Sequence, residues 1–160
     1  MKVLFLTAFI CLGVLSGYCQ DAPKGTNIII VTGTSLQLVA KTLIDSGFAI
    51  EKSDSGKIVT KPREYIDIKQ PQKTKLYHLI MIIRLKDSTA IITGIYDYQI
   101  IQNNLFAPTA QANNIGNYIT VSNSESSSSY MRQSFNHMVT FAKSLNSKLV
   151  FEKRELKKGQ

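Results

Sequence analysis

Apolar residues along the chain recur with two different periods, and these periods predict a mixed α+β domain. The run at 27–31 (NIIIV) is short and β-branched, which is typical of a buried strand. The segment behind it carries the spacing of one helix face, through Leu36, Val39, Ala40, Leu43 and Ile44. Thr34 with Gln37 fits a capping box at the start of this helix, and Gly47 fits the left-handed position after its last turn.

Paired runs further along predict two β-hairpins. Residues 48–52 and 57–61 flank a turn sequence that contains glycine. Residues 76–85 and 89–101 are longer and more apolar, and the three polar residues at 86–88 join them. Shorter extended segments complete the predicted sheet, at 65–68, 119–121 and 149–151.

The strand predicted at 76–85 is apolar on both of its faces. Successive residues of a strand point to opposite sides of the sheet, and here both sets are largely apolar. An antiparallel sheet with one wet face would alternate apolar with polar residues instead. We therefore expect a helix, the C-terminal tail or a second subunit to cover the second face, with His78, Ile80 and Ile82 as the candidate interface.

A second, longer helix is predicted near the C-terminus. Its apolar stripe consists of Met131, Phe135, Met138, Val139, Ala142 and Leu145, with Phe141 at the edge. The serine-rich segment at 122–129 precedes it and offers a serine cap. Together the elements predict an α+β fold: an antiparallel sheet of about five to six strands, with an N-terminal helix and a long C-terminal helix packed on one face.

The first 19 residues predict a secretory signal peptide. A short basic start, an apolar run at 3–15 and small residues behind it follow the order of such a leader. A membrane anchor is the alternative, but this run is short for a span of about 20 residues. Tyr18 before Cys19 departs from a lipoprotein signal, which needs a small residue at that position. We expect cleavage before Gln20 and export to the periplasm or the extracellular space.

Removal of this leader would leave residues 20–152 as a single α+β domain and residues 153–160 as a basic C-terminal tail. The chain has 160 residues, 44% hydrophobic and 19% charged, which is ordinary for one globular domain. Both cysteines lie in the leader, so the mature domain would hold no disulfide. The absence of any Asn-x-Ser/Thr acceptor favours a bacterial envelope protein over an animal secreted one.

The formal net charge of +8 does not by itself predict a nucleic-acid partner. Basic residues crowd the C-terminus, but no aromatic residues are interleaved with them to stack on single-stranded bases. A solvated basic surface is the simpler interpretation, and we do not expect nucleic acid binding.

Residues suited to catalysis or metal binding are few. Outside the leader the histidines are His78, inside an apolar strand, and His137, which we expect to be exposed on the second helix. They lack the spacing of a zinc site, and the chain has no GxSxG or SxxK motif. Asp97, between two tyrosines, has the most notable neighbourhood of the carboxylates, although an exposed strand position explains it more simply. No catalytic residue, metal or cofactor is predicted.

Aromatic side chains offer a place for a ligand. Tyr96, Tyr98, Phe135 and Met138 would line a groove between the sheet and the C-terminal helix, suited to a small apolar ligand. The alternative is that these side chains only fill the core.

The segment at 46–62 (SGFAIEKSDSGKIVTKP) resembles the helix-grip domains of bacterial envelope proteins such as the BamC lipoproteins of the outer-membrane assembly machinery. In that family a strand and a helix lead to a G-[FW]-x-[IV] strand and a D-x-x-G-x-[IV] hairpin. The matching positions are Gly47, Phe48 and Ile50, then Asp54, Gly56 or Lys57, Ile58 and Val59. The resemblance covers the first third of the predicted mature chain. It implies a helix-grip or TBP-like fold and a periplasmic scaffold or interaction module without catalytic residues.

These observations predict an exported, non-catalytic domain that binds a protein partner or a second copy of itself. The first alternative is a carrier of a small apolar ligand between the sheet and the C-terminal helix. The second is a hydrolase of unknown type, which would need polar side chains gathered around Asp97 or His78.

Overall fold

The computed structural model describes residues 21–70, 73–102, 109–111, 116–124, 126 and 129–155. The predicted signal peptide and residues 156–160 of the predicted tail lie outside the described residues. In chain order the elements are β1 (Ile28–Thr32), α1 (Leu36–Asp45), β2 (Ile50–Asp54), β3 (Lys57–Thr60), β4 (Arg63–Gln70), β5 (Lys73–Lys86), β6 (Thr89–Gln102), β7 (Thr109–Gln111), β8 (Ile119–Thr120), α2 (Tyr130–Ser144) and β9 (Lys148–Glu152).

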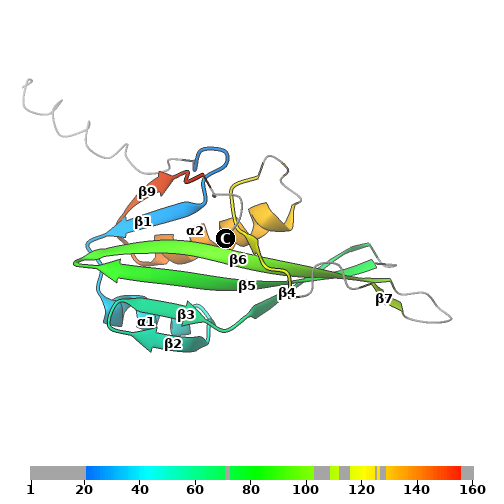
Figure 1. Cartoon of the computed structure of the whole chain (residues 1–160), viewed down its shortest axis with the longest axis horizontal. Helices are drawn as coiled ribbons and strands as arrows, with labels where there is room; N and C mark the ends of the chain where they lie inside the picture. Colours follow the sequence, from blue (N-terminus) through cyan, green and yellow to red (C-terminus); the bar gives the residue numbers. More distant parts are fainter. Residues whose placement is uncertain are drawn as a thin grey trace, which may run out of the picture.

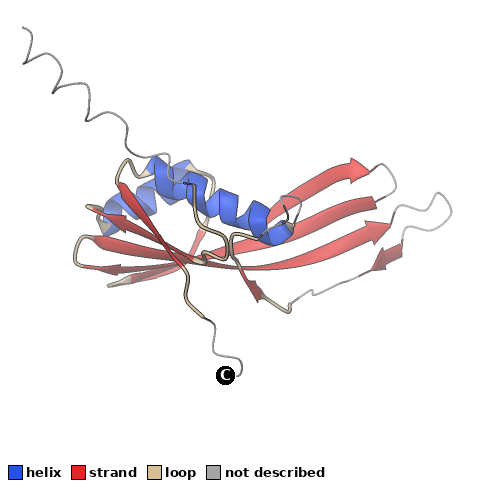
Figure 2. Cartoon of the chain, turned by 90° about the horizontal axis from the view of Figure 1, so that it is seen from above, coloured by secondary structure: helices blue, strands red, loops and turns tan. Residues whose placement is uncertain are grey.

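The strands form one antiparallel sheet, and the fold is α+β as predicted. The order across the sheet is β2-β3-β5-β6-β1-β9, while β4 pairs with β5, and β7 and β8 pair with β6. Figure 2 shows both helices on the same side of this sheet. The described residues form nine strands instead of the predicted five to six, since β4, β7 and β8 pair with β5 or β6 outside the main strand order. Among them, β7 has no counterpart in the sequence prediction.

The hairpin of β5 and β6 runs along the whole length of the sheet (Figure 1). Its two strands pair continuously from Lys73 opposite Gln102 to Lys86 opposite Thr89. The turn therefore holds only Asp87 and Ser88, one residue fewer than the predicted connection at 86–88. Asp87 makes this possible, since its φ of 54° is the left-handed conformation that a two-residue hairpin turn requires and aspartate tolerates.

Helix α1 begins one residue later than the predicted capping box implies. The N-cap is Ser35, whose side chain accepts a hydrogen bond from the Leu38 backbone N–H at 3.2 Å. Gly47 has the predicted left-handed conformation, with φ of 78°. Val39 and Leu43 are buried, whereas Ile44 is 63% exposed, so the packing face of the helix is narrower than the sequence pattern indicates.

Helix α2 lies across the sheet and closes the core. Its N-cap is Ser129, which supplies the expected serine cap by accepting from the Arg132 backbone N–H at 3.1 Å. Phe135, Met138 and Phe141 of this helix are almost fully buried. The helix packs closely on β6 at Gly94, where an added Cβ would lie 2.5 Å from the Met138 sulfur.

The side of the sheet opposite the helices is called here the helix-free face. On β5 and β6 it includes Leu76, His78, Ile80, Ile82, Arg84, Ile91, Thr93, Ile95, Asp97 and Gln99. No helix of the described residues lies on it (Figure 2). Most of these side chains are partly exposed, while Ile80 and Asp97 are buried. The predicted cover by a helix is thus wrong for the described part of the chain, since both helices share the other face.

The described part of the C-terminal tail does not cover this face either. Asn27 donates to the Arg154 carbonyl and accepts from the Arg154 N–H, both at 2.9 Å. These bonds hold the segment after β9 beside the start of β1, and β6 separates β1 from β5. Residues 153–155 therefore stay at the β1 and β9 side of the sheet.

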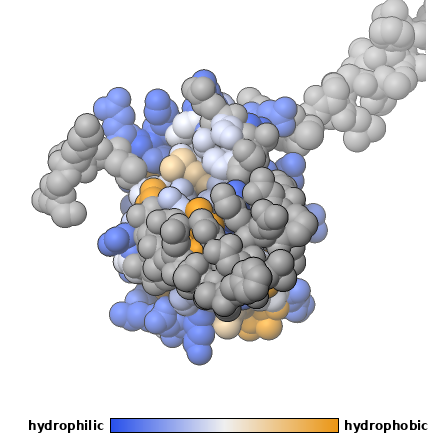
Figure 3. All heavy atoms as spheres, turned by 90° about the vertical axis from the view of Figure 1, so that its right-hand side faces the viewer, coloured by the Kyte–Doolittle hydropathy of each residue, from blue (hydrophilic) through white to orange (hydrophobic). Residues whose placement is uncertain are grey.

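Large apolar side chains that are exposed are scattered over several elements. They are Leu38, Ile44, Ile66, Tyr118 and Val150. Seen from the end of the molecule, apolar residues form small patches among hydrophilic ones (Figure 3). The described residues contain two helices, α1 and α2. Neither is long and apolar enough to cross a bilayer.

Candidate functional site

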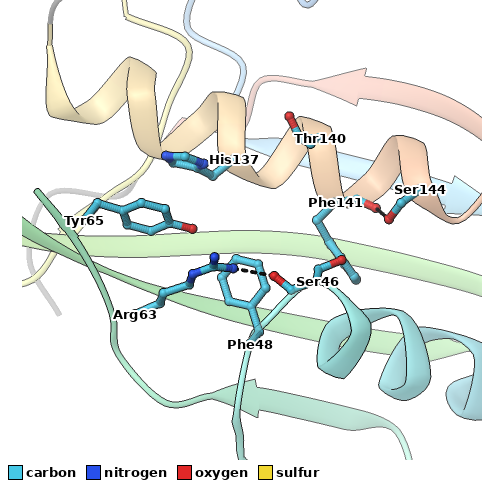
Figure 4. Close-up of a pocket in the computed structure, with 8 residues that line it drawn as sticks. All are labelled: Ser46, Phe48, Arg63, Tyr65, His137, Thr140, Phe141 and Ser144. Atoms are coloured by element: carbon cyan, nitrogen blue, oxygen red, sulfur yellow. Dashed lines mark hydrogen bonds between the residues drawn. The ribbon is translucent and has the colours of Figure 1, made fainter.

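A pocket of about 240 Å³ opens on the helix-bearing side of the sheet, between the end of α1, the start of β4 and the second half of α2. Its lining residues are Ser46, Phe48, Arg63, Tyr65, His137, Thr140, Phe141 and Ser144 (Figure 4). They come from three segments that are far apart in the sequence. The pocket therefore forms only when the chain is folded, and no single sequence motif predicts it.

Arg63 is the charged side chain of the pocket. Alternation along β4 places Arg63 and Tyr65 on the helix-bearing side, where they face α1 and α2. The Arg63 Nη1 donates to the carbonyl of Ser46, the C-cap residue of α1, at 2.5 Å. A cation is favoured there because the last carbonyls of a helix carry partial negative charge.

Two aromatic rings hold the guanidinium of Arg63 in place. Its Cζ lies 4.6 Å from the centre of the Phe48 ring and 5.2 Å from the centre of the Tyr65 ring. Among the residues that the structure describes, no carboxylate lies within ion-pair distance of it. Arg63 thus brings a positive charge into a largely aromatic pocket without an acidic partner there.

His137 faces Arg63 across the pocket (Figure 4). Its ring stacks on Tyr65 with centroids 3.9 Å apart, and its Nε2 lies 3.0 Å from the hydroxyl of Tyr77. The predicted exposure of His137 is therefore wrong, because β4 and β5 bring aromatic rings against this part of α2. Burial, and then the charge of Arg63, lower the pKa of His137 below its usual 6.5. Burial raises the pKa of Tyr65, against an opposing effect of Arg63.

The candidate groove residues lie outside this pocket, on α2 and on β6 beneath it. Tyr96, Phe135 and Met138 are 6%, 1% and 0% exposed and belong to the hydrophobic core. Tyr98 is partly buried in a row of aromatic rings, 5.3 Å from the ring of Tyr130. None of the four lines the pocket. Their burial agrees with the alternative interpretation, in which they fill the core.

On the helix-free face, His78 and Asp97 form a direct pair. They are opposite residues of β5 and β6, and the His78 Nδ1 lies 2.7 Å from the Asp97 Oδ1. Asp97 also accepts from the Gly116 N–H at 3.2 Å and is only 4% exposed. The exposed strand position predicted for Asp97 is therefore wrong, since its partners and the segment at Gly116 enclose the carboxylate.

Glu64 completes a polar row across this face, with its Oε2 3.6 Å from the His78 Nε2. Both ring nitrogens of His78 thus face carboxylates. A hydrolytic dyad would need a hydroxyl nucleophile at the second nitrogen, and no described residue provides one there. Within the described ranges, no group of three or more His, Cys, Asp or Glu side chains is arranged to hold a metal ion.

The two remaining interface candidates lie on one side of this polar row, in the next two rows along β5. Ile80 is 9% exposed and Ile82 is partly exposed, and both lie on the helix-free face next to Ile95 and Thr93 of β6. The structure thus brings His78, Ile80 and Ile82 onto one surface.

Comparison with known proteins adds no relative: the chain matches no protein-family model, and no curated protein is significantly similar to it.

Proposed function

We propose that this protein is an exported, non-catalytic binding domain of the bacterial envelope with a helix-grip arrangement, and that its helix-free face binds a second copy of the chain. The observation that carries this proposal is the two-sided apolar character of β5. One side of the strand packs under the helices, and no helix of the described residues covers the other side, which the segment at Gly116 reaches at Asp97 of the neighbouring strand.

Apolar rows on the helix-free face supply the driving force for association. Across the sheet, Val150, Ile30 and Ile91 form an apolar row that continues into Arg84 and Lys57, and in the next row Val59 and Ile82 lie beside Thr93. The apolar side chains of both rows are partly exposed in the single chain, with Val150 exposed at 38%. Burial of such surface contributes roughly 25 cal/mol per Å² of apolar area.

A second copy is the occupant that this composition favours. In a two-fold arrangement the same patch meets itself, so apolar rows lie against apolar rows, as between the sheets of a β-sandwich. The formal net charge of +8 makes two copies repel each other at long range. An apolar face is a surface through which they can still associate.

Light scattering of the purified protein with Ile82→Lys as the variant tests this proposal. We expect a dimer for the natural chain and a monomer for Ile82→Lys, because a lysine ammonium would be buried in the interface. Ile44→Lys is the matched control, since Ile44 is a 63% exposed isoleucine on α1. A natural chain that is monomeric at all accessible concentrations contradicts self-association, as does a dimer unaffected by Ile82→Lys.

Export has its own test. The intact mass of the protein recovered outside the bacterial cytoplasm is expected to correspond to a chain that begins at Gln20. A full-length mass in the cytoplasm contradicts this part of the proposal.

Carriage of a small ligand is a second candidate function. The pocket beside α2 supports it, since the pocket lies between a helix and the sheet and is partly lined by aromatic rings. Native mass spectrometry of protein purified from its host tests this candidate. A retained small-molecule mass supports it, and repeated absence of any such mass argues against it.

A further inference from the structure

We propose that the pocket around Arg63 binds a small organic carboxylate with a flat apolar body, such as an aromatic acid. This inference rests on the second candidate function and changes the ligand class from apolar to anionic. It does not depend on association through the helix-free face, which lies on the other side of the sheet.

The charge of Arg63 decides the sign of the ligand. A guanidinium carries five N–H donors in a planar fork, and Arg63 uses Nη1 for the Ser46 carbonyl. No described carboxylate neutralises it. An arginine that is partly buried without an acid gains most from an anion that accepts from its remaining donors.

The position of this guanidinium is fixed before any ligand binds. The Phe48 and Tyr65 rings pack against it, and the bond to Ser46 anchors it at the end of α1. Figure 4 shows it among the lining residues, below His137. A held donor group loses little conformational entropy when it binds an anion, which favours affinity for a small ligand.

The remaining lining supplies an apolar surface and a hydroxyl. Tyr65 is the partly exposed ring of the lining, while Phe48 and Phe141, which are 5% and 2% exposed, form the apolar wall behind it. Thr140 lies on the opposite, α2 side, and its side chain is exposed and makes no hydrogen bond to a described residue. It is thus available as a donor to the ligand.

Size and charge favour a monoanionic carboxylate over phosphate. The volume of about 240 Å³ is below the range of about 300 to 1,000 Å³ for drug-sized ligands, so the ligand is small. Phosphate sites generally offer several backbone N–H groups or more than one cation. Here Arg63 is the cation of the lining, and the lowered pKa of His137 keeps that ring neutral near pH 7.

Binding of benzoate to the purified full chain tests this inference. We expect saturable binding by calorimetry or NMR, with chemical-shift changes at His137 and Thr140, and much weaker binding of benzyl alcohol and inorganic phosphate. Equal binding of benzyl alcohol would show an apolar site, and preference for phosphate would show a phosphate site. Either result overturns the proposal, as does absence of benzoate binding at millimolar concentration.

Two variants connect the binding to the pocket. Arg63→Gln is expected to weaken benzoate binding by about tenfold or more, because removal of a charge-assisted pair costs at least about 1.4 kcal/mol. Arg84→Gln is the matched control, since Arg84 is an exposed arginine on the helix-free face. Because Arg63 also caps α1, Thr140→Glu is the second test: its carboxylate would compete for Arg63 without removal of that cap.

The two proposals fail independently. Benzoate binding that persists in Ile82→Lys, together with loss of the dimer, supports both of them. Benzoate affinity that is unchanged in both Arg63→Gln and Thr140→Glu overturns the pocket assignment, whatever the oligomeric state.

Discussion

The pair of His78 and Asp97 is expected to stabilise the fold by a coupling that a double-mutant cycle can measure. Asp97→Ala removes the carboxylate that faces the His78 Nδ1 at 2.7 Å, and also the acceptor of the Gly116 N–H. His78→Ala removes only the histidine. Comparison of the two single variants with the double variant isolates the energy of the pair, since the loss at Gly116 occurs in both variants of Asp97.

The expected coupling free energy is about 1 to 2 kcal/mol. A hydrogen bond to a charged group contributes about 1.5 to 3 kcal/mol when it is buried. Asp97 is nearly inaccessible, but the side chain of His78 is 29% exposed, so water replaces part of the bond in the variants. Glu64 contributes little, because its carboxylate is 53% exposed and 3.6 Å from the ring.

Urea denaturation at one fixed protein concentration provides the free energies of unfolding. Glu64→Ala serves as the control, since it removes a carboxylate of the same polar row and is expected to change stability by less than about 0.5 kcal/mol. A coupling below about 0.3 kcal/mol, with the two single effects simply adding, would refute a bonded pair in the folded protein.

Three further predictions follow from single contacts. Gly94→Ala is expected to lower stability by about 1 to 3 kcal/mol in thermal denaturation, because the new Cβ would meet the Met138 sulfur, and an unchanged Tm would contradict this close approach. Ser35→Ala is expected to cost about 1 kcal/mol and Thr34→Ala less, because Ser35 caps α1 and the buried Thr34 hydroxyl lacks a partner; equal costs would contradict this assignment. The pKa of His137 is lower in the folded state than its usual 6.5, so its contribution to stability is present above that value and is lost as the pH falls toward the folded pKa. His137→Gln is expected to reduce the loss of stability between pH 7 and 5 in denaturation curves, and an identical pH profile would contradict this role.

Sequence patterns predict the elements of this fold because burial acts on long periodic runs. The β5 and β6 hairpin, both helices and the edge strand β9 all correspond to predicted segments. In each of these elements several apolar residues share one face, so the local pattern predicts the element without knowledge of the helices and strands packed against it. The same reasoning predicts too wide a packing face for α1, because Ile44 has helical spacing but is 63% exposed.

The register of the long hairpin depends on a single residue of its turn. A three-residue turn would place His78 opposite Tyr96, whereas the two-residue turn at Asp87 and Ser88 places it opposite Asp97. The signal that identifies the correct register is chemical, since it pairs the two polar residues inside apolar strands. A comparison of polar positions across the hairpin in both registers would identify this pair from the sequence.

The pocket depends on tertiary structure that no local pattern contains. Ser46, Arg63 and His137 meet only because β4 pairs with β5 and α2 crosses above them. Two partial signals are present: Arg63 and Tyr65 share one face of a strand, and His137 lies one turn before the buried Phe141 on α2. Their convergence follows from the order of strands in the sheet, which hairpin patterns alone leave open.

Contacts between copies test the central claim about the helix-free face most directly. In a mixture of chains labelled at isoleucine methyl groups and unlabelled chains, isotope-filtered NMR detects only contacts between different molecules. We predict such contacts at the partly exposed Ile82, Ile91 and Ile95 of the helix-free face, and none at the exposed Ile44 of α1. Absence of intermolecular contacts at these three residues at millimolar concentration would contradict the proposed interface.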